Sequence, residues 1–251
     1  MKTRNITCSG ILVRALEWWH GCELRRVARK IPGAYELVVQ GGPFRGLQLA
    51  SDVDPSKNLP KIIGSYEMEL HKVIDKLIKR DFRLFLNVGA AEGYYAVGMA
   101  MRMPMCKVIA FEMDEAQAKR CRSTAILNSV ERRITVRGKC DSDALAKFDL
   151  DDSLIIMDCE GAEIDILQGI LLPRLSKTWL LIELHDSFRP GASRILYQRF
   201  HHSHEMEFIE AASRNPDSWV AGHNLSMRQK TLAVFENRLG TQEWVIMTPK
   251  S

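Results

Sequence analysis

The feature that most constrains the fold is a regular alternation of short apolar runs with helix-like segments. The runs are RLFLNVG, KVIAFE, RITVRG, SLIIMD and TWLLIEL, and all but the third lead into a segment whose apolar residues fall at helical spacing. Strands that are apolar on both faces are typical of a parallel sheet covered by helices on each side. The pattern therefore predicts a doubly wound α/β fold in one large domain, for which 251 residues are sufficient.

The chain ahead of this alternation predicts an extension of the core. Residues 11–30 carry Arg14, Glu17 and His20, which is too much polarity for a membrane span. We expect a surface helix packed on the domain, with attachment to a membrane surface through two adjacent tryptophans as the alternative. Residues 35–50 predict two short strands joined by a Gly-Gly-Pro turn.

The last part of the chain breaks the alternation. Residues 205–212, 229–236 and 243–249 are strand-like, and we expect antiparallel pairing among them on the edge of the sheet. These patterns divide the chain into a helix and β-hairpin extension over 1–63 and a main domain over 64–251.

Two glycines stand where the first apolar run gives way to a helix. Gly89 and Gly93, in the stretch GAAEG, allow a tight turn and a close approach of the backbone to a ligand. Ligands of doubly wound sheets bind beyond the carboxyl ends of the strands, and an acid about 20 residues after the turn holds a ribose. Glu112 fits this position, with a solvated strand end as the simpler alternative. Asp141 and Asp158 follow later strands, and we expect them in the same cleft.

The glycine turn also carries information about the ligand. A dinucleotide site needs three glycines close to a pyrophosphate, whereas this turn has two and contains Glu92. A carboxylate there repels a pyrophosphate and suits a ligand with positive charge, such as the ammonium or sulfonium of S-adenosylmethionine. The turn therefore favours S-adenosylmethionine as the cofactor.

These motifs resemble the class I S-adenosylmethionine-dependent methyltransferases, and within them the FkbM-type family. The resemblance rests on GSYEMEL, NVGAAEGYYAVGMA, AFEMD, MDCEGAEIDILQG and LLIELH, spans residues 64–186, and is most specific from Asp158 to Glu163. It implies a Rossmann-like, mainly parallel seven-stranded sheet of order 3-2-1-4-5-7-6 with the last strand antiparallel. One departure is Asn87, where the family usually has Asp, because an amide lacks the charge that helps to bind the methionine ammonium.

The resemblance and the strand ends together define the expected cofactor site. Its residues are Tyr66, Glu67, Asn87, Gly89, Ala90, Glu92, Gly93, Glu112, Met113, Asp141 and Asp158. By resemblance, Tyr66 and Glu67 close the methionine end of the site, whereas Tyr95 is expected to pack in the core.

The expected catalytic residues are His185, Asp158 and Glu160. Transfer from a sulfonium mainly needs alignment, and a base is needed only where the acceptor carries a proton. His185 is the expected base for a hydroxyl acceptor because its ordinary pKa lies near neutral pH, with a purely structural histidine as the alternative. Asp158 and Glu160 end a buried strand, where acids are costly unless they hold something. Glu163 has an equal alternative as a first-turn carboxylate stabilised by a helix dipole.

No metal site is expected, since no H-x-x-x-H or close Cys/His set occurs, and HHSHE over 201–205 reads as a solvated helix end. The six cysteines are scattered without a CxxC pair and no cleavable signal sequence is visible, which predicts a cytoplasmic protein with reduced thiols.

The expected function is O-methylation of a hydroxyl on a small molecule or sugar, with no membrane insertion. One alternative is a nucleic-acid-modifying enzyme that uses arginines such as Arg132 and Arg133. A net charge of +4 does not demand such a partner, and no Asn/Asp-Pro-Pro-aromatic motif occurs. The other alternative is a non-catalytic S-adenosylmethionine-binding protein. The sequence leaves the acceptor's identity and the oligomeric state open.

Overall fold

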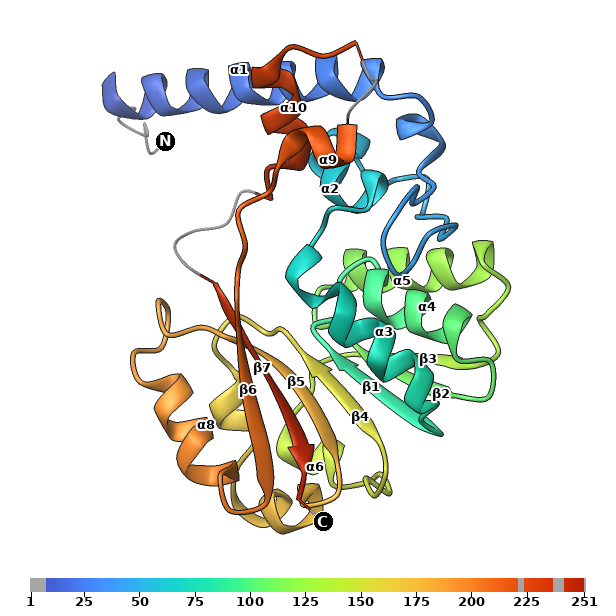
Figure 1. Cartoon of the computed structure of the whole chain (residues 1–251), viewed down its shortest axis with the longest axis vertical. Coiled ribbons are helices and arrows are strands. Elements are labelled where there is room, and N and C mark those ends of the chain that lie inside the picture. The colour runs from blue at the N-terminus through green and yellow to red at the C-terminus, as the bar shows by residue number, and fades with distance from the viewer. Residues whose placement is uncertain (1–7, 221–223, 237–241, 251) are drawn as a thin grey trace, which may run out of the picture.

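The chain folds around one seven-stranded sheet (Figure 1). The structure, a computed structural model, describes residues 8–220, 224–236 and 242–250, with side chains described from residue 19 onward. The strands are β1 (Leu84–Val88), β2 (Lys107–Phe111), β3 (Ile134–Arg137), β4 (Leu154–Met157), β5 (Trp179–Leu184), β6 (His204–Glu210) and β7 (Glu243–Pro249). Their order in the sheet is β3-β2-β1-β4-β5-β7-β6, as expected.

Six of the strands run in one direction and β7 runs against them. β1 pairs in parallel with β2 and β4, β2 with β3, and β4 with β5. β7 lies between β5 and β6 and is antiparallel to both. The carboxyl ends of the other six strands therefore share one edge of the sheet, where ligands of this kind of fold bind.

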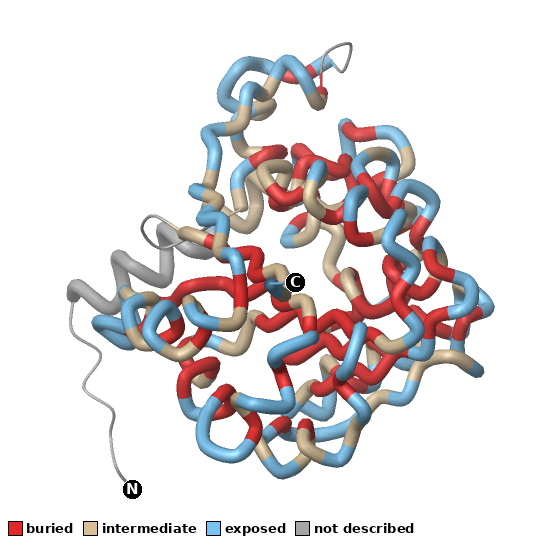
Figure 2. Tube along the Cα trace, turned by 60° about the horizontal axis from the view of Figure 1, so that its bottom comes forward, coloured by how far each residue is buried: buried red, intermediate tan, exposed pale blue. Residues whose placement is uncertain are grey.

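Helices cover both faces of the sheet. One face carries α3 (His71–Arg80), α4 (Tyr94–Arg102) and α5 (Glu115–Leu127); the other carries α6 (Ser142–Leu145), α7 (Glu163–Ile166), the 3₁₀ helix η4 (Gly169–Leu175) and α8 (Ala192–Phe200). Successive strand residues point to opposite faces, so Ile156 belongs to the core under α3–α5 and Ile155 to the core under α6–α8. Figure 2 shows this continuous buried interior. The runs of β1, β2, β4 and β5 are thus buried on both sides, as the sequence predicts, whereas β3 at the edge of the sheet alternates between half-buried and exposed residues.

A group of helices lies beyond the carboxyl edge of the sheet (Figure 1). It comprises α1 (Cys8–Lys30), α2 (Leu59–Ile63), α9 (Pro216–Val220) and α10 (Met227–Val234), with the 3₁₀ turns η1 (Ala34–Glu36), η2 (Pro55–Lys57) and η3 (Met68–Leu70) between the first helices and α3. Val27 and Ala28 of α1 are buried in the core under α3–α5, so this end of α1 packs on the domain. None of the described helices has both the length and the apolarity needed to cross a bilayer.

Two expected elements differ from the structure. Residues 229–236 were expected as a strand, but 227–234 form α10, which begins with a capping box between Ser226 and Gln229. The expected hairpin over 35–50 is reduced to one antiparallel bridge between Val38 and Gln48. The flanking hydrogen bonds still join the two segments, from the amide of Val39 to the Leu47 carbonyl and from the amide of Leu49 to the Leu37 carbonyl, both at 2.8 Å. The amide of Gln48 faces away from this pair and donates to the Asn128 side chain at 3.0 Å.

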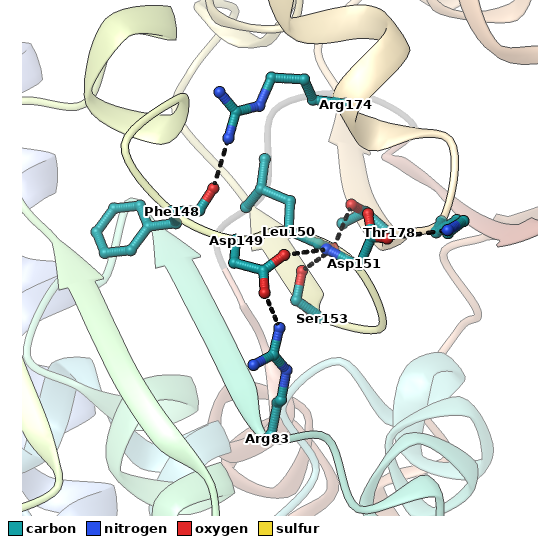
Figure 3. Close-up of polar contacts among 9 residues, drawn as sticks. Arg83, Phe148, Asp149, Leu150, Asp151, Ser153, Arg174 and Thr178 are labelled. Carbon is teal, nitrogen blue, oxygen red and sulfur yellow. Dashed lines mark hydrogen bonds and ion pairs between the residues drawn. The ribbon is translucent and has the colours of Figure 1, made fainter.

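The amino edge of the sheet is held by a polar cluster (Figure 3). The hydroxyls of Ser153 and Thr178 both donate to the Leu150 carbonyl, at 2.6 and 2.8 Å, and Arg83 pairs with Asp149. These groups tie the loops that precede β1, β4 and β5 together. The polar residues named here at the amino edge are therefore hydrogen-bonded or ion-paired to one another. The cleft lies at the carboxyl edge, where polar groups face it.

Candidate functional site

The glycine turn after β1 crosses close against the end of β4. The amides of Gly89 and Ala90 both donate to the Phe111 carbonyl at 3.0 Å. Gly89 has a φ of +81°, and a Cβ on it would lie 1.7 Å from the carbonyl oxygen of Asp158. Only glycine fits where the two strand ends approach so closely. Gly93 has a φ of +95° and stands at the start of α4.

Glu112 connects this turn to the end of β2. One carboxylate oxygen accepts a hydrogen bond from the amide of Ala91 at 2.8 Å, and the other accepts one from the amide of Asp114 at 2.8 Å. Each oxygen keeps a further lone pair, so the carboxylate can still accept hydrogen bonds from a ligand. The side chain is held at the carboxyl end of β2 and faces the cleft.

An open cleft of about 300 Å³ lies at the carboxyl ends of β1, β2 and β4. Its lining residues are Val88, Gly89, Ala91, Phe111, Glu112, Met113, Lys139, Cys140, Asp158, Cys159, Glu160, Ala162 and Ile166. The volume is typical of a site for a small organic ligand. Apolar side chains form much of the wall, and a few acids converge on it, as in a site that holds a flat ring and fixes hydroxyl groups.

Five of the expected site residues line this cleft, and others lie near it. Gly89, Glu112, Met113, Asp158 and Glu160 are part of the lining. The remaining expected site residues do not line the cleft, and the surroundings of most of them are described below. The lining residues that the sequence analysis did not name, such as Phe111, Lys139 and Cys140, adjoin the strand ends. Their position at or just after the carboxyl end of a predicted strand is the signal that could have identified them.

Asn87 is buried within β1, just before the glycine turn. Its amide nitrogen donates weakly to the Ile156 carbonyl at 3.4 Å, and its Oδ1 has no hydrogen-bond partner among the described residues. An unpaired buried acceptor is costly, and a ligand donor that reaches it would remove this cost.

Glu92 does not face the cleft. It is buried and forms an ion pair with Lys61, whose ammonium also lies 4.8 Å from the ring centre of Tyr66. Burial alone raises the pKa of Glu92, but the charge and hydrogen bond of Lys61 outweigh it and bring the pKa below its ordinary value. The charge of Glu92 is therefore compensated within the protein, so the expectation that it faces a cationic ligand is not met.

Three more expected cofactor residues have structural partners. Asp141 caps α6, where its side chain accepts from the amide of Ala144 at 2.8 Å. Glu67 is buried and accepts a hydrogen bond from the Tyr95 hydroxyl. Tyr66 packs edge-on against Tyr94, with ring centres 5.4 Å apart. None of the three expected residues lines the cleft.

His185 follows β5 and lies at the centre of four carboxylates. Its Nδ1 is 2.9 Å from Glu163 Oε1, and its Nε2 is 3.5 Å from Asp158, 3.7 Å from Glu183 and 3.8 Å from Glu160. Burial lowers the pKa of His185, but the hydrogen bond and charge of Glu163, with the charges of the other acids, outweigh it and the net direction is upward. Because Asp158 and Glu160 also line the cleft, this cluster forms part of its wall.

The run HHSHE is not one solvated helix end. His204 begins β6 and is buried, with its Nε2 2.9 Å from the Thr178 carbonyl and its Nδ1 2.8 Å from the Ser203 hydroxyl. His201 stacks on Tyr197 of α8, with ring centres 5.1 Å apart. The histidines of this run therefore have separate structural roles.

The sheet order and the cleft define the fold of class I S-adenosylmethionine-dependent methyltransferases. No protein-family model and no curated protein matches the chain. Solved structures do match. An O-methyltransferase from Bacillus cereus in complex with SAH superposes with a TM-score of 0.50 at 14% identity, over 91% of this chain and 91% of that one.

Two further structures support the same fold. A protein from Klebsiella pneumoniae described as an O-methyltransferase matches with a TM-score of 0.51 at 14% identity, over 91% of this chain and 90% of that one. A protein from Clostridium thermocellum described as an rRNA methylase matches with a TM-score of 0.51 at 8% identity, over 73% and 96%. Identities this low establish the fold, and chemistry has to be argued from the site.

Proposed function

We propose that this chain is an S-adenosylmethionine-dependent methyltransferase of FkbM type that methylates a hydroxyl of a small molecule or sugar. The observation that carries the proposal is the convergence of the Gly89 turn, Glu112 and Asp158 on one cleft at the carboxyl edge of the sheet. In this fold that edge is where the ligand binds, and an acid after the second strand is placed for ribose hydroxyls.

The residues present fit the proposed cofactor. Glu112 would accept hydrogen bonds from the ribose, since each of its oxygens keeps a free lone pair. Phe111 and Ile166 offer apolar surface for the adenine. Asn87 and Asp158 would lie toward the methionine end, where the unpaired Oδ1 of Asn87 would accept from a donor. When bound, the cofactor supplies an activated methyl group.

The acceptor hydroxyl would lose its proton at the cluster around His185. In the simplest form Nε2 of His185 takes the proton, and Asp158 and Glu160 beside it stabilise the imidazolium that forms. The helices beyond the carboxyl edge, α1 and α2 of the N-terminal extension together with α9 and α10, would supply the walls of the acceptor site.

A cofactor titration tests the donor half of the proposal. Glu112→Ala should weaken S-adenosylmethionine by about 1.5 to 3 kcal/mol, the range for hydrogen bonds to a charged group. Glu115→Ala is the matched control, because Glu115 is a nearby carboxylate in the first turn of α5 that does not line the cleft. Calorimetry that gives the same affinity for wild type and Glu112→Ala would remove Glu112 from the ribose site.

The acceptor half needs a turnover assay. Formation of S-adenosylhomocysteine with a panel of hydroxylated metabolites and sugars would support a small-molecule enzyme, and cofactor binding without turnover on any acceptor would favour the non-catalytic alternative. A nucleic-acid acceptor is less favoured because at least two of the arginines that would form the basic surface have partners within the protein: Arg133 donates to the Met103 carbonyl at 3.0 Å, and Arg26 pairs with Glu23 at 2.7 Å. Binding to RNA that weakens steeply with salt would reverse this preference.

A further inference from the structure

The imidazole of His185 has an unusual environment on its second nitrogen. The side chain is 4% exposed, yet among the described residues no hydrogen bond involves its Nε2. The nearest oxygens belong to Asp158, Glu183 and Glu160, at 3.5, 3.7 and 3.8 Å. This nitrogen therefore faces carboxylates without a hydrogen bond to any of them, and it can still take a partner.

We propose that Asp158, Glu183 and His185 bind a divalent transition-metal ion at the carboxyl ends of β4 and β5. One ligand atom from each residue lies within 4.8 Å of the other two. Two ligands about 2.1 Å from one ion at a tetrahedral angle lie about 3.4 Å apart. The distances from Nε2 to Asp158 and Glu183 are close to this value, so a small inward movement completes the site.

A proton on Nε2 explains the arrangement less well than a metal ion does. An N–H donor draws an acceptor to about 2.7–3.2 Å, and the oxygens around Nε2 are all farther away. A divalent ion midway between the ligands fits such spacing. One nitrogen and two oxygen ligands suit Mn²⁺, Fe²⁺ or Zn²⁺.

Glu163 prepares His185 for this role. Its carboxylate is 1% exposed and lies 2.9 Å from Nδ1 of His185. The amides of Cys159 and Gly161 donate to the same oxygen, at 3.1 and 3.3 Å, which fixes its position. A histidine that ligates a metal usually donates its other ring N–H to a carboxylate, which leaves the opposite lone pair for the ion. Glu163 is thus a positioning residue.

The ion deepens the proposed function, and its role in catalysis rests on that function. Asp158 lies in the wall of the cofactor cleft, so an acceptor hydroxyl could reach the ion as a further ligand. Coordination lowers the pKa of the hydroxyl. The O–H bond then breaks with its electron pair left on the metal-bound oxygen, and the proton passes to Glu160, which is 77% exposed and can release it to water. His185 acts as a ligand in this form, and no longer as the base.

Metal binding can be measured without any acceptor. Calorimetric titration of the full chain with Mn²⁺, and separately with Zn²⁺, should show one site for at least one of the two ions. Glu183→Gln and His185→Gln should each weaken it at least about 10-fold, and Glu163→Gln about 10- to 100-fold. Asp165→Asn is the matched control, because this exposed carboxylate of the same segment pairs with Arg189 instead.

The outcomes separate this inference from the proposed function. Circular dichroism first shows that each variant is folded. A folded wild-type protein that binds neither ion, or an affinity that His185→Gln and Glu183→Gln leave unchanged, overturns the metal site. A parallel titration with S-adenosylmethionine in the presence of EDTA reports on the cofactor alone. If the protein binds the cofactor but neither metal ion, the proposed function stands and the metal site is wrong. If the protein binds a metal ion but no cofactor, the metal site stands and the proposed function is wrong.

Discussion

Replacing Lys61 by Met should reverse the pH dependence of the stability that Glu92 contributes. In the wild type, Lys61 pairs with buried Glu92, and the pKa of Glu92 is lowered. That carboxylate therefore contributes stability that is present above pH 4.5, its ordinary pKa, and is lost as pH falls through its folded value. In Lys61→Met the burial of Glu92 is no longer offset by its partner, so its pKa rises above 4.5. Its contribution is then favourable in acid and is lost as pH rises.

The size of the effect follows from the burial of the pair. Removing one partner of a buried ion pair costs about 3 to 5 kcal/mol. Glu92 can limit this cost by taking up a proton. Keeping a carboxyl group of ordinary pKa 4.5 protonated at pH 7 costs about 1.4 kcal/mol per pH unit above its pKa, or roughly 3.4 kcal/mol. We therefore expect Lys61→Met to be destabilised by about 3 kcal/mol at pH 7 and by much less near pH 4.5.

Urea unfolding of wild type and Lys61→Met at several pH values between 4.5 and 7 measures this directly. The free energy of unfolding of the variant should decrease by up to about 1.4 kcal/mol for each unit of rising pH. The double variant Lys61→Met/Glu92→Gln is the control, because it has no carboxylate to protonate and should lose this slope. Equal slopes for wild type and Lys61→Met would refute the assignment of Glu92 as a charged group held by Lys61.

Two further predictions concern a residue at the carboxyl end of β1 and a residue at the start of β6. Gly89→Ala should reduce stability by at least about 2 kcal/mol and impair cofactor binding, because the residue has a positive φ and its Cβ would overlap the Asp158 carbonyl; an unchanged thermal midpoint would contradict the close approach. His204 is buried and its pKa is lowered, chiefly by burial, so its stabilising effect is complete above pH 6.5 and is lost as pH falls toward the folded pKa. An NMR titration of the His204 imidazole should have its midpoint below 6.5, and a midpoint at or above that value would show the ring to be accessible.

The strands could be predicted because their signal is local and strong. An apolar run such as LIIM in β4 is buried on both faces, and few structures other than a covered parallel strand accommodate it. The C-terminal run TLAVF has a similar composition, and it was wrongly predicted as a strand. The capping box of Ser226 and Gln229 was a visible signal for a helix start. The prediction gave more weight to the apolar composition than to the capping residues, but the structure shows the helix that the capping residues indicate.

The site was less accessible to sequence reasoning because partners distant in the chain decide it. Glu92 stands inside the glycine turn, and its role is set by Lys61, which precedes it by 31 positions. Gln48 follows a turn that suggests a hairpin, and its outward-facing amide bonds to the side chain of Asn128, which lies 80 positions later in the chain. By contrast, Glu112 and Asp158 could be placed at the cleft, because the end of each parallel strand is itself visible in the sequence.

The position of β7 has a consequence for how the protein is made. This strand is the last in the chain, yet it lies inside the sheet, between β5 and β6. During synthesis β5 therefore emerges long before the strand that covers its free edge, and β6 has no sheet neighbour until Glu243–Pro249 follows. An exposed edge of this kind is a site of wrong pairing between nascent chains. We expect a chain that stops before β7 to be caught by chaperones or to aggregate, even though the residues that line its cleft are already encoded.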